Sequence, residues 1–377
     1  MKKAFYILTI LFFIFFTTAC SDYDLSVPDY LSNGLEYLRI LQCPAVITIN
    51  GSTIYCDSLE DAIDAVPSNG TGVITLLKDI SNPGNAYVVN SGKTITILSD
   101  GNRSISRSGS GGIFLVNDSG TALILGNGSN TLKLTGAEDN FTPVIYMNNS
   151  RLEMNDGVII TGNIIENGSA SAVAVHGGGS VFQMNGGIIE GNTVGRGTVD
   201  LSSDIYGGAT FNMTGNATIR NNTASGYVAA GAGVYVHSGC TFFMDGNSSI
   251  SGNTVTSTSG SNNGGGGVCV NSGTFNMGGN AVISGNSCSG ITDGGGGVYL
   301  FGGVFTMDDG AIISGNSSGN NGGGVYINST SSLHMDGTSS ITGNTTAGTG
   351  GGVYTAFGGS FLKYGSSDVS GNTPNDY

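Results

Sequence analysis

The chain has 377 residues, of which 66 are glycine and only 10% are charged, and its formal net charge is −14. A surface this acidic repels phosphate groups, so we expect no nucleic acid as a partner. The glycine content does not indicate collagen, because no strict Gly-x-y triplet runs through the sequence. Short apolar runs recur too regularly for a disordered linker, so the sequence predicts an ordered protein that is rich in turns.

Residues 1–19 have the pattern of a secretory signal. Lys2 and Lys3 precede an apolar run that is too short for a stable membrane span. Cys20 follows directly after a small residue and resembles the lipidated cysteine of a bacterial lipoprotein box, although Thr17 stands where leucine is usual. The resemblance implies that Cys20 carries a lipid that anchors the mature chain to a membrane without spanning it. Simple cleavage of the signal is the alternative.

Residues 20–43 are polar, acidic and without periodicity, and we interpret them as a tether. An Asn-Gly pair at 50–51, between two β-rich runs, then predicts a β-hairpin. Its register places Cys56 opposite Ala45, with Cys43 further along the same face. A Cys43–Cys56 disulfide is one reading in an exported protein, and two small buried thiols are the other.

A short helix is predicted to follow the hairpin and to complete a segment over 44–67. Residues 58–61 have the spacing of a capping box, and Pro67 ends the pattern about ten residues later. We expect this helix to cover the open first coil of a stacked sheet, because exposed strand edges recruit other chains. Residues 68–150 then contain strands of a less regular kind, beginning with 73–77 and 94–98.

Two ladders of identical residues run through 151–377. Methionines recur every 28 to 33 residues, and asparagines keep step with them. An array with this period is a stack of one unit, repeated about eight times, rather than a globule with one central core. The methionine ladder is Met154, Met184, Met213, Met244, Met277, Met307 and Met335, and the asparagine ladder is Asn163, Asn192, Asn222, Asn253, Asn286, Asn316, Asn344 and Asn372.

Each unit holds three short runs with a period of two, separated by glycine turns. That period is typical of strands. We therefore predict a right-handed parallel β-helix with three strands per coil and a rise of about 4.8 Å from one coil to the next. In the Phe-x-Met segments both large residues point inward. The asparagines lie at a bend, where their amides can bond to the same residue one coil further on. The inward phenylalanines are Phe211, Phe242, Phe275, Phe305 and Phe361.

The order of hairpin, "SLEDAIDAV" and "VITLL" resembles the opening of the pectin-lyase-like right-handed parallel β-helix superfamily. The later "ISGNT" and "GGGGV" segments resemble repeats of bacterial polymorphic outer-membrane and adhesin-like proteins. The asparagines match the family motif, whereas Ile250, Ile283, Ile313 and Ile341 stand where the family has phenylalanine. The resemblance implies a surface-exposed protein, often adhesive, and the superfamily also includes polysaccharide lyases and hydrolases.

Residues suited to catalysis or metal binding do not form a convincing pattern. The nearest approach to a carboxylate cluster is Asp308, Asp309 and Asp336, with Asp245 at the same bend of an earlier unit. Aspartate beside glycine is also ordinary turn chemistry, which we favour. No lysine or arginine lies between Arg220 and Lys363 to serve as the base of a lyase. The histidines (His176, His237 and His334) and three cysteines (Cys240, Cys269 and Cys288) occupy different places in the unit, so we predict no metal, cofactor or catalytic residue.

One column of residues suggests a ligand surface. If Val234 and Val236 face inward, Tyr235 faces outward, and equivalent tyrosines recur in later units with Cys269 in the gap. A stripe of exposed phenol rings can bind sugar rings or a protein. The alternative is that the stripe packs under the variable loops. Its members are Tyr235, Tyr299, Tyr326 and Tyr354.

Together these observations predict an exported, lipid-anchored, all-β protein in the outer membrane or at the cell surface of a bacterium. We expect a non-catalytic adhesin-like or structural role, with a membrane and a glycan or host-surface protein as partners. A carbohydrate-active enzyme or glycan-binding protein on the same scaffold is the alternative.

Overall fold

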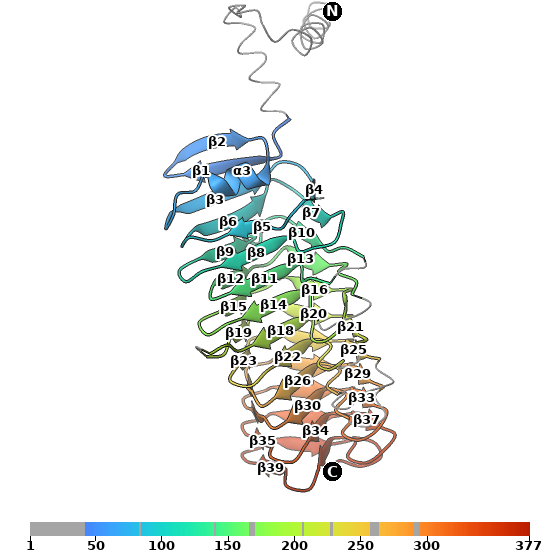
Figure 1. Ribbon diagram of the computed structural model, residues 1–377. Coiled ribbons are helices and arrows are strands. Elements are labelled where there is room, and N and C mark those ends of the chain that lie inside the picture. The colour runs from blue at the N-terminus through green and yellow to red at the C-terminus, as the bar shows by residue number, and fades with distance from the viewer. Residues whose placement is uncertain are drawn as a thin grey trace, which may run out of the picture.

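The computed structural model describes residues 42–377, except for 83, 139–140, 166–169, 206, 227–228, 257–263 and 290–293. The signal segment, Cys20 and most of the tether lie outside the described residues. The described chain winds into a parallel β-helix of about nine turns, with strands stacked one above another along its length (Figure 1). The predicted all-β parallel β-helix class is therefore confirmed.

Sheet A is the longest sheet and begins with the predicted hairpin. β1 pairs antiparallel with both β2 and β3, and every later pairing in the sheet is parallel. Cys56 lies opposite Ala45, as the sequence predicts. The strands in spatial order are β2 (Ser52–Cys56), β1 (Ala45–Ile49), β3 (Thr71–Leu76), β6 (Thr94–Ser99), β9 (Ala122–Leu125), β12 (Arg151–Met154), β15 (Val181–Met184), β19 (Thr210–Met213), β23 (Thr241–Met244), β27 (Thr274–Met277), β31 (Val304–Met307), β35 (Ser332–Met335) and β39 (Ser360–Lys363).

Sheet B follows sheet A in each turn, and its short strands alternate one buried residue between two half-buried ones in most turns. Its strands are β4 (Ile80–Asn82), β7 (Arg103–Arg107), β10 (Leu132–Thr135), β13 (Val158–Thr161), β16 (Ile188–Glu190), β20 (Thr218–Arg220), β24 (Ser249–Ser251), β28 (Val282–Ser284), β32 (Ile312–Ser314), β36 (Ser340–Thr342) and β40 (Asp368–Ser370).

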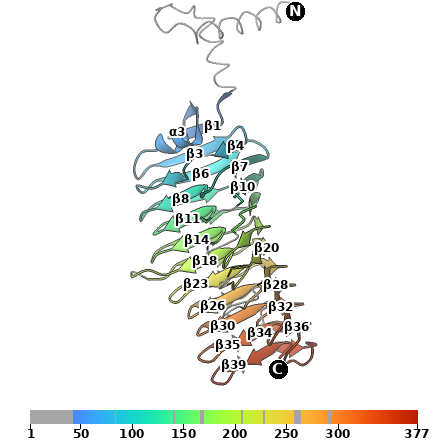
Figure 2. The same ribbon diagram turned by 45° about the vertical axis from the view of Figure 1, so that its right-hand side comes forward.

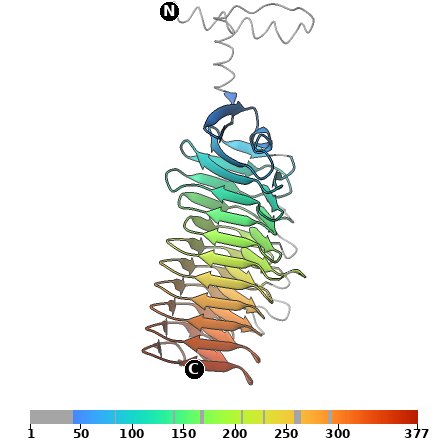
Figure 3. The ribbon, with the colours of Figure 1, turned by 90° about the vertical axis from the view of Figure 1, so that its left-hand side faces the viewer.

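Sheet C precedes sheet A in each turn and forms another side of the stack, which Figures 2 and 3 show from two further directions. In its middle strands both faces are buried. Its strands are β5 (Tyr87–Val89), β8 (Phe114–Asn117), β11 (Ile145–Asn148), β14 (Val173–His176), β18 (Val199–Ser202), β22 (Val234–Val236), β26 (Val268–Asn271), β30 (Val298–Phe301), β34 (Val325–Ile327) and β38 (Val353–Thr355).

A fourth sheet departs from the prediction of three strands per coil. Sheet D lies just after the asparagine bend, and each of its strands has two residues. Such a short extended step leaves no periodicity for sequence reading to detect. The strands are β17 (Thr193–Val194), β21 (Thr223–Ala224), β25 (Thr254–Val255), β29 (Ser287–Cys288), β33 (Ser317–Ser318) and β37 (Thr345–Thr346).

On sheet A the interior is built from columns of like residues. Phenylalanine rings stack face to face with centroids 4.4 to 4.9 Å apart. The methionines form the adjoining column, with each residue paired to its equivalent in the next turn and almost no exposure. Burying one such side chain contributes roughly 1.5–3 kcal/mol. The stacked rings are Phe182, Phe211, Phe242, Phe275 and Phe305; Leu333 takes the next place, and Phe361 is half-buried.

The asparagine bend is held by a continuous chain of amide bonds. The backbone N–H and Nδ2 of Asn286 both donate to Oδ1 of Asn316, at 2.9 and 3.0 Å. Nδ2 of Asn286 also donates to the carbonyl of Ile250 in the preceding turn. The same pattern repeats from Asn192 to Asn344, and these side chains are buried. The last member, Asn372, donates instead to Oδ1 of Asp376.

Helix α3 (Leu59–Asp64) lies at the N-terminal end of the stack and is shorter than predicted, with six residues. Its N-cap is the predicted Ser58, whose Oγ accepts the backbone N–H of Asp61 at 3.0 Å. Three of its residues (Leu59, Ala62 and Ile63) join the main core. That the helix protects the first coil remains a prediction.

Candidate functional site

The aspartates that sequence reading singled out are engaged in their own turns. Oδ1 of Asp308 accepts the backbone N–H of Asp309 at 2.7 Å, and Oδ1 of Asp336 accepts that of Gly337 at 2.8 Å. Asp245 bonds to Gly246 in the same way at 2.6 Å. All of these side chains are exposed. This geometry is what turn chemistry requires and does not form a carboxylate pair with an acid and a base role.

The tyrosine column does not form an exposed stripe, so that part of the prediction is wrong. Tyr299 is fully buried, Tyr235 and Tyr326 are 8% and 9% exposed, and Tyr354 is half-buried. The rings do point away from the inner core, and they form a second apolar cluster together with Ala230 and Cys269. The alternative reading, in which the column packs under the variable loops, describes what the structure has.

The glycine runs explain why the tyrosines are covered. A Cβ at Gly264 would lie 2.7 Å from Cγ of Tyr299, and a Cβ at Gly294 would lie 3.0 Å from Cδ2 of Tyr326. The loop backbone of one turn therefore lies directly on the ring of the next, which is possible only without a side chain. In these turns the outer face of sheet C is a second interior, so Tyr299 and Tyr326 are not available for stacking sugars.

A cluster of charged and aromatic side chains interrupts this tyrosine column. Asp200 on β18 takes the place of tyrosine and is 4% exposed. Nη2 of Arg196 lies 2.8 Å from Oδ2 of Asp200, and Nε2 of His237 lies 3.2 Å from Oδ1. The guanidinium of Arg196 also lies over the ring of Tyr235, 4.7 Å from its centroid. We call Arg196, Asp200 and His237, with Tyr235 and His176, the Asp200 cluster.

Sequence reading missed this cluster and placed the histidines at different positions of the unit. The strand register shows that two of the histidines hold equivalent positions. His176 pairs with Ser202, and Leu201 pairs with Val236, which puts His237 next to Ser202 in the column. His176 and His237 therefore lie in one column, two turns apart. The signal was present in the sequence. Extending the repeat alignment by one unit to Val199-Asp200-Leu201 puts an acid into the tyrosine column, where it requires a partner.

The pKa values of the cluster reflect its burial. For Asp200, burial alone would raise the pKa, but contact with His237 and the charge of Arg196 outweigh it and hold the pKa below its usual range. Burial lowers the pKa of His176, and the charge of Asp200 opposes that effect only in part. Asp200 is thus a carboxylate whose charge is neutralised within the protein. Such a cluster can orient an imidazole.

We expect the Asp200 cluster to make stability depend on pH in two acidic windows. In the unfolded chain His176 takes up a proton near pH 6.5, and Asp200 does so near pH 3.8. In the folded protein the pKa of each group is lower, so each takes up its proton only at a lower pH. The free energy of unfolding should therefore fall as the pH drops below about 6.5, and fall again below about 3.8. Urea unfolding at a series of pH values tests this, and His176→Gln should flatten the upper window. An unchanged slope in that variant would contradict the account.

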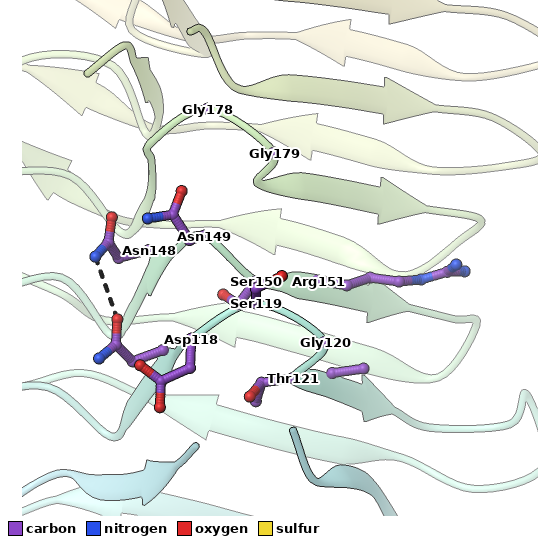
Figure 4. A pocket seen from close by; sticks show the side chains of 12 residues that line it. Asp118, Ser119, Gly120, Thr121, Asn148, Asn149, Ser150, Arg151, Gly178 and Gly179 are labelled. Atoms are coloured by element: carbon purple, nitrogen blue, oxygen red, sulfur yellow. Dashed lines mark hydrogen bonds between the residues drawn. The ribbon is translucent and has the colours of Figure 1, made fainter. Parts of the chain in front are cut away.

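A polar hollow of about 570 Å³ lies between the turns that join sheet C to sheet A (Figure 4). Its polar groups mainly bond to one another or to the backbone. Nδ2 of Asn148 donates to Oδ1 of Asn117 at 3.2 Å, and Oγ of Ser150 donates to the carbonyl of Val116. The side chain of Arg151 points away from these asparagines and pairs with Glu153 at 2.7 Å. The hollow is a product of stacked turns and brings no acid and base together.

The described cysteines are all buried thiols. Cys43 and Cys56 are not joined by a disulfide in the structure, which corresponds to the second of the two readings. Burial is the main cause of the raised pKa of Cys56, and burial raises the pKa of Cys240 to about 11. The thiols of Cys56 and Cys240 are therefore poor nucleophiles. Within residues 42–377, excluding the gaps given above, no group of three His, Cys, Asp or Glu side chains is arranged to hold a metal ion.

Comparisons of the chain with protein-family models, with curated proteins and with solved structures give no match. Among the described helices, none is both long enough and apolar enough to cross a membrane. The resemblance to pectin-lyase-like and adhesin-like families, and the lipoprotein-type signal, therefore remain predictions from the sequence.

Proposed function

We propose that this chain is a non-catalytic, surface-displayed β-helix protein of adhesin-like or structural kind. The observation that supports this best is the state of its carboxylates. Asp245, Asp308 and Asp336, in the turns that follow sheet A, bond to the backbone of their own turns, and Asp200, the one buried carboxylate among the described residues, is paired with Arg196 and contacts His237. Most side chains of the stack pack against or bond to other parts of the same chain. A rigid spacer that presents one face far from an anchor suits display.

The proposal includes export and attachment through Cys20. Expressed in a bacterial host, the full chain should sediment with the membrane fraction, and Cys20→Ala should move it to the soluble fraction, because the lipid is its only expected anchor. Cell fractionation with immunodetection measures this. A membrane-bound Cys20→Ala variant would show that lipidation is not the means of attachment.

Surface display is tested by protease treatment and amine-reactive labelling of intact cells. A displayed chain is cut or labelled from outside, whereas a periplasmic protein is protected until the cells are opened. A periplasmic marker serves as the control for leakage. Protection of the full chain in intact cells would contradict the surface location.

A carbohydrate-active enzyme or glycan-binding protein on the same scaffold is the second candidate, favoured by the pairing of a half-buried histidine, His237, with Asp200. A turnover assay on acidic polysaccharides, with and without calcium, distinguishes the two. Activity that is lost in His237→Ala, or in variants of Asp308 and Asp336, would favour the enzyme. No turnover with any of them favours the non-catalytic proposal.

A further inference from the structure

A groove on the outer face of sheet A adjoins the aspartate turns described above. It has a volume of about 420 Å³, and its lining includes Phe243, Asp245, Gly278 and Asp308. Phe243 is 43% exposed, although its neighbour Phe242 is fully buried in the core. An exposed aromatic ring beside a hollow is a common feature of surfaces that bind a partner.

The groove exists because one turn lacks a side chain. The residue after each methionine of the ladder stands directly over its equivalent, since Gly278 N–H donates to the carbonyl of Met244 and Asp308 N–H to that of Met277. Asp245, Gly278 and Asp308 therefore form one column. Glycine in the middle leaves a notch in this column, between the backbone positions of two aspartates that lie two rises of about 4.8 Å apart. We call this the Gly278 notch.

The notch carries negative charge, and its aspartates take part in none of the ion pairs found among the described residues. The sequence has no lysine or arginine between Arg220 and Lys363. A third carboxylate lies close by, because Oδ2 of Asp309 accepts the backbone N–H of Gly279 at 3.2 Å. A Cβ at Gly278 would lie 3.3 Å from that oxygen and 4.0 Å from Oδ1 of Asp245. Carboxylate oxygens thus border the notch on both sides, beside the exposed ring.

Such an arrangement fits an organic cation with an apolar stem. A lysine or arginine side chain packs its methylene groups against apolar surface and keeps its charged head near carboxylates. A cation beside an exposed phenyl ring gains a further cation–π attraction. The groove is open and shallow and lies on a flat sheet of small polar residues, which suits a side chain presented by a protein.

We propose that the Gly278 notch is a docking site for a lysine or arginine side chain of a basic partner protein. This deepens the adhesin-like function proposed above, since it names the chemistry of the partner and the face that receives it. It predicts weak binding that weakens further with salt, because the charges are exposed.

The test uses the purified full chain and a fluorescein-labelled peptide of alternating lysine and serine, followed by anisotropy. Phe243→Ala, Asp245→Asn and Asp308→Asn should each weaken binding roughly two- to fivefold. Gly278→Gln, which fills the notch, should abolish it. The matched control is Asp336→Asn, because Asp336 occupies the same column one turn further on, bonds to its own turn in the same way, and does not line the groove.

Three outcomes would overturn the proposal. Equal weakening by Asp336→Asn would show attraction to net charge alone. If Gly278→Gln has the circular dichroism spectrum of the wild type and still binds the peptide undiminished, the peptide binds elsewhere. Competition by spermidine as strong as that by the unlabelled peptide would show a site for small amines instead of protein side chains. Because the assay needs no cells, its failure is separate from failure of surface display.

Discussion

Replacing Asn286 with alanine should lower the free energy of unfolding by about 2–5 kcal/mol. Asn286 is fully buried in the middle of the ladder. Its Oδ1 accepts the backbone N–H of Asn253 at 2.9 Å, and its Nδ2 donates to the carbonyl of Ile250 at 3.0 Å. Alanine leaves the N–H of Asn253 without an acceptor in a dry interior. Each such buried, unsatisfied group costs about 1–3 kcal/mol, and the effect extends to the neighbouring turns of the ladder.

The matched control is Asn280→Ala in the same turn. Asn280 also donates an amide bond to an equivalent asparagine, Asn247, but this bond is 3.3 Å long and exposed to solvent. Its loss should change the free energy of unfolding by no more than about 0.5 kcal/mol. Urea unfolding followed by circular dichroism measures both variants. Equal losses of stability in the two variants would contradict the prediction, because burial would then not explain what the ladder contributes.

The stacked core could be predicted from the sequence because its signal is repetition. Met277 and Phe275 recur with the same spacing in turn after turn, and residues that repeat in a stack must lie over one another. The asparagine bend was predictable for the same reason. The two-residue strands of sheet D were not, because β29 and its equivalents are too short to show a period.

The outer surface could not be predicted in the same way. An alternating strand such as Val298-Tyr299-Leu300 says that Tyr299 points away from the core, but not whether anything covers it. The cover comes from the glycines before each strand of sheet C, such as Gly264 and Gly294; they recur in the sequence, but their repetition does not show that their backbone lies on a ring of the next turn. The Asp200 cluster depends on Arg196, which lies in a loop and reaches the column through tertiary contact alone. The notch at Gly278 likewise appears only when three turns are placed side by side.

Phe242→Ala should destabilise the protein strongly and Phe243→Ala hardly at all, although the two residues are adjacent in β23. Phe242 is fully buried, and its ring stacks between those of Phe211 at 4.9 Å and Phe275 at 4.7 Å. Truncating it removes the apolar burial and leaves a cavity that the two turns on either side hold open, so we expect a loss of about 3–5 kcal/mol in the free energy of unfolding.

Phe243 points to the other face of the sheet and is 43% exposed, so its truncation should change stability by no more than about 0.5 kcal/mol. The pair therefore separates folding from binding within one strand. Phe242→Ala weakens the stack through its column, and Phe243→Ala leaves a stable stack with an altered Gly278 notch. Urea unfolding of both variants, beside the peptide assay, gives the measurement. A large loss of stability in Phe243→Ala would mean that its ring supports the fold, and its exposure would then no longer indicate a partner.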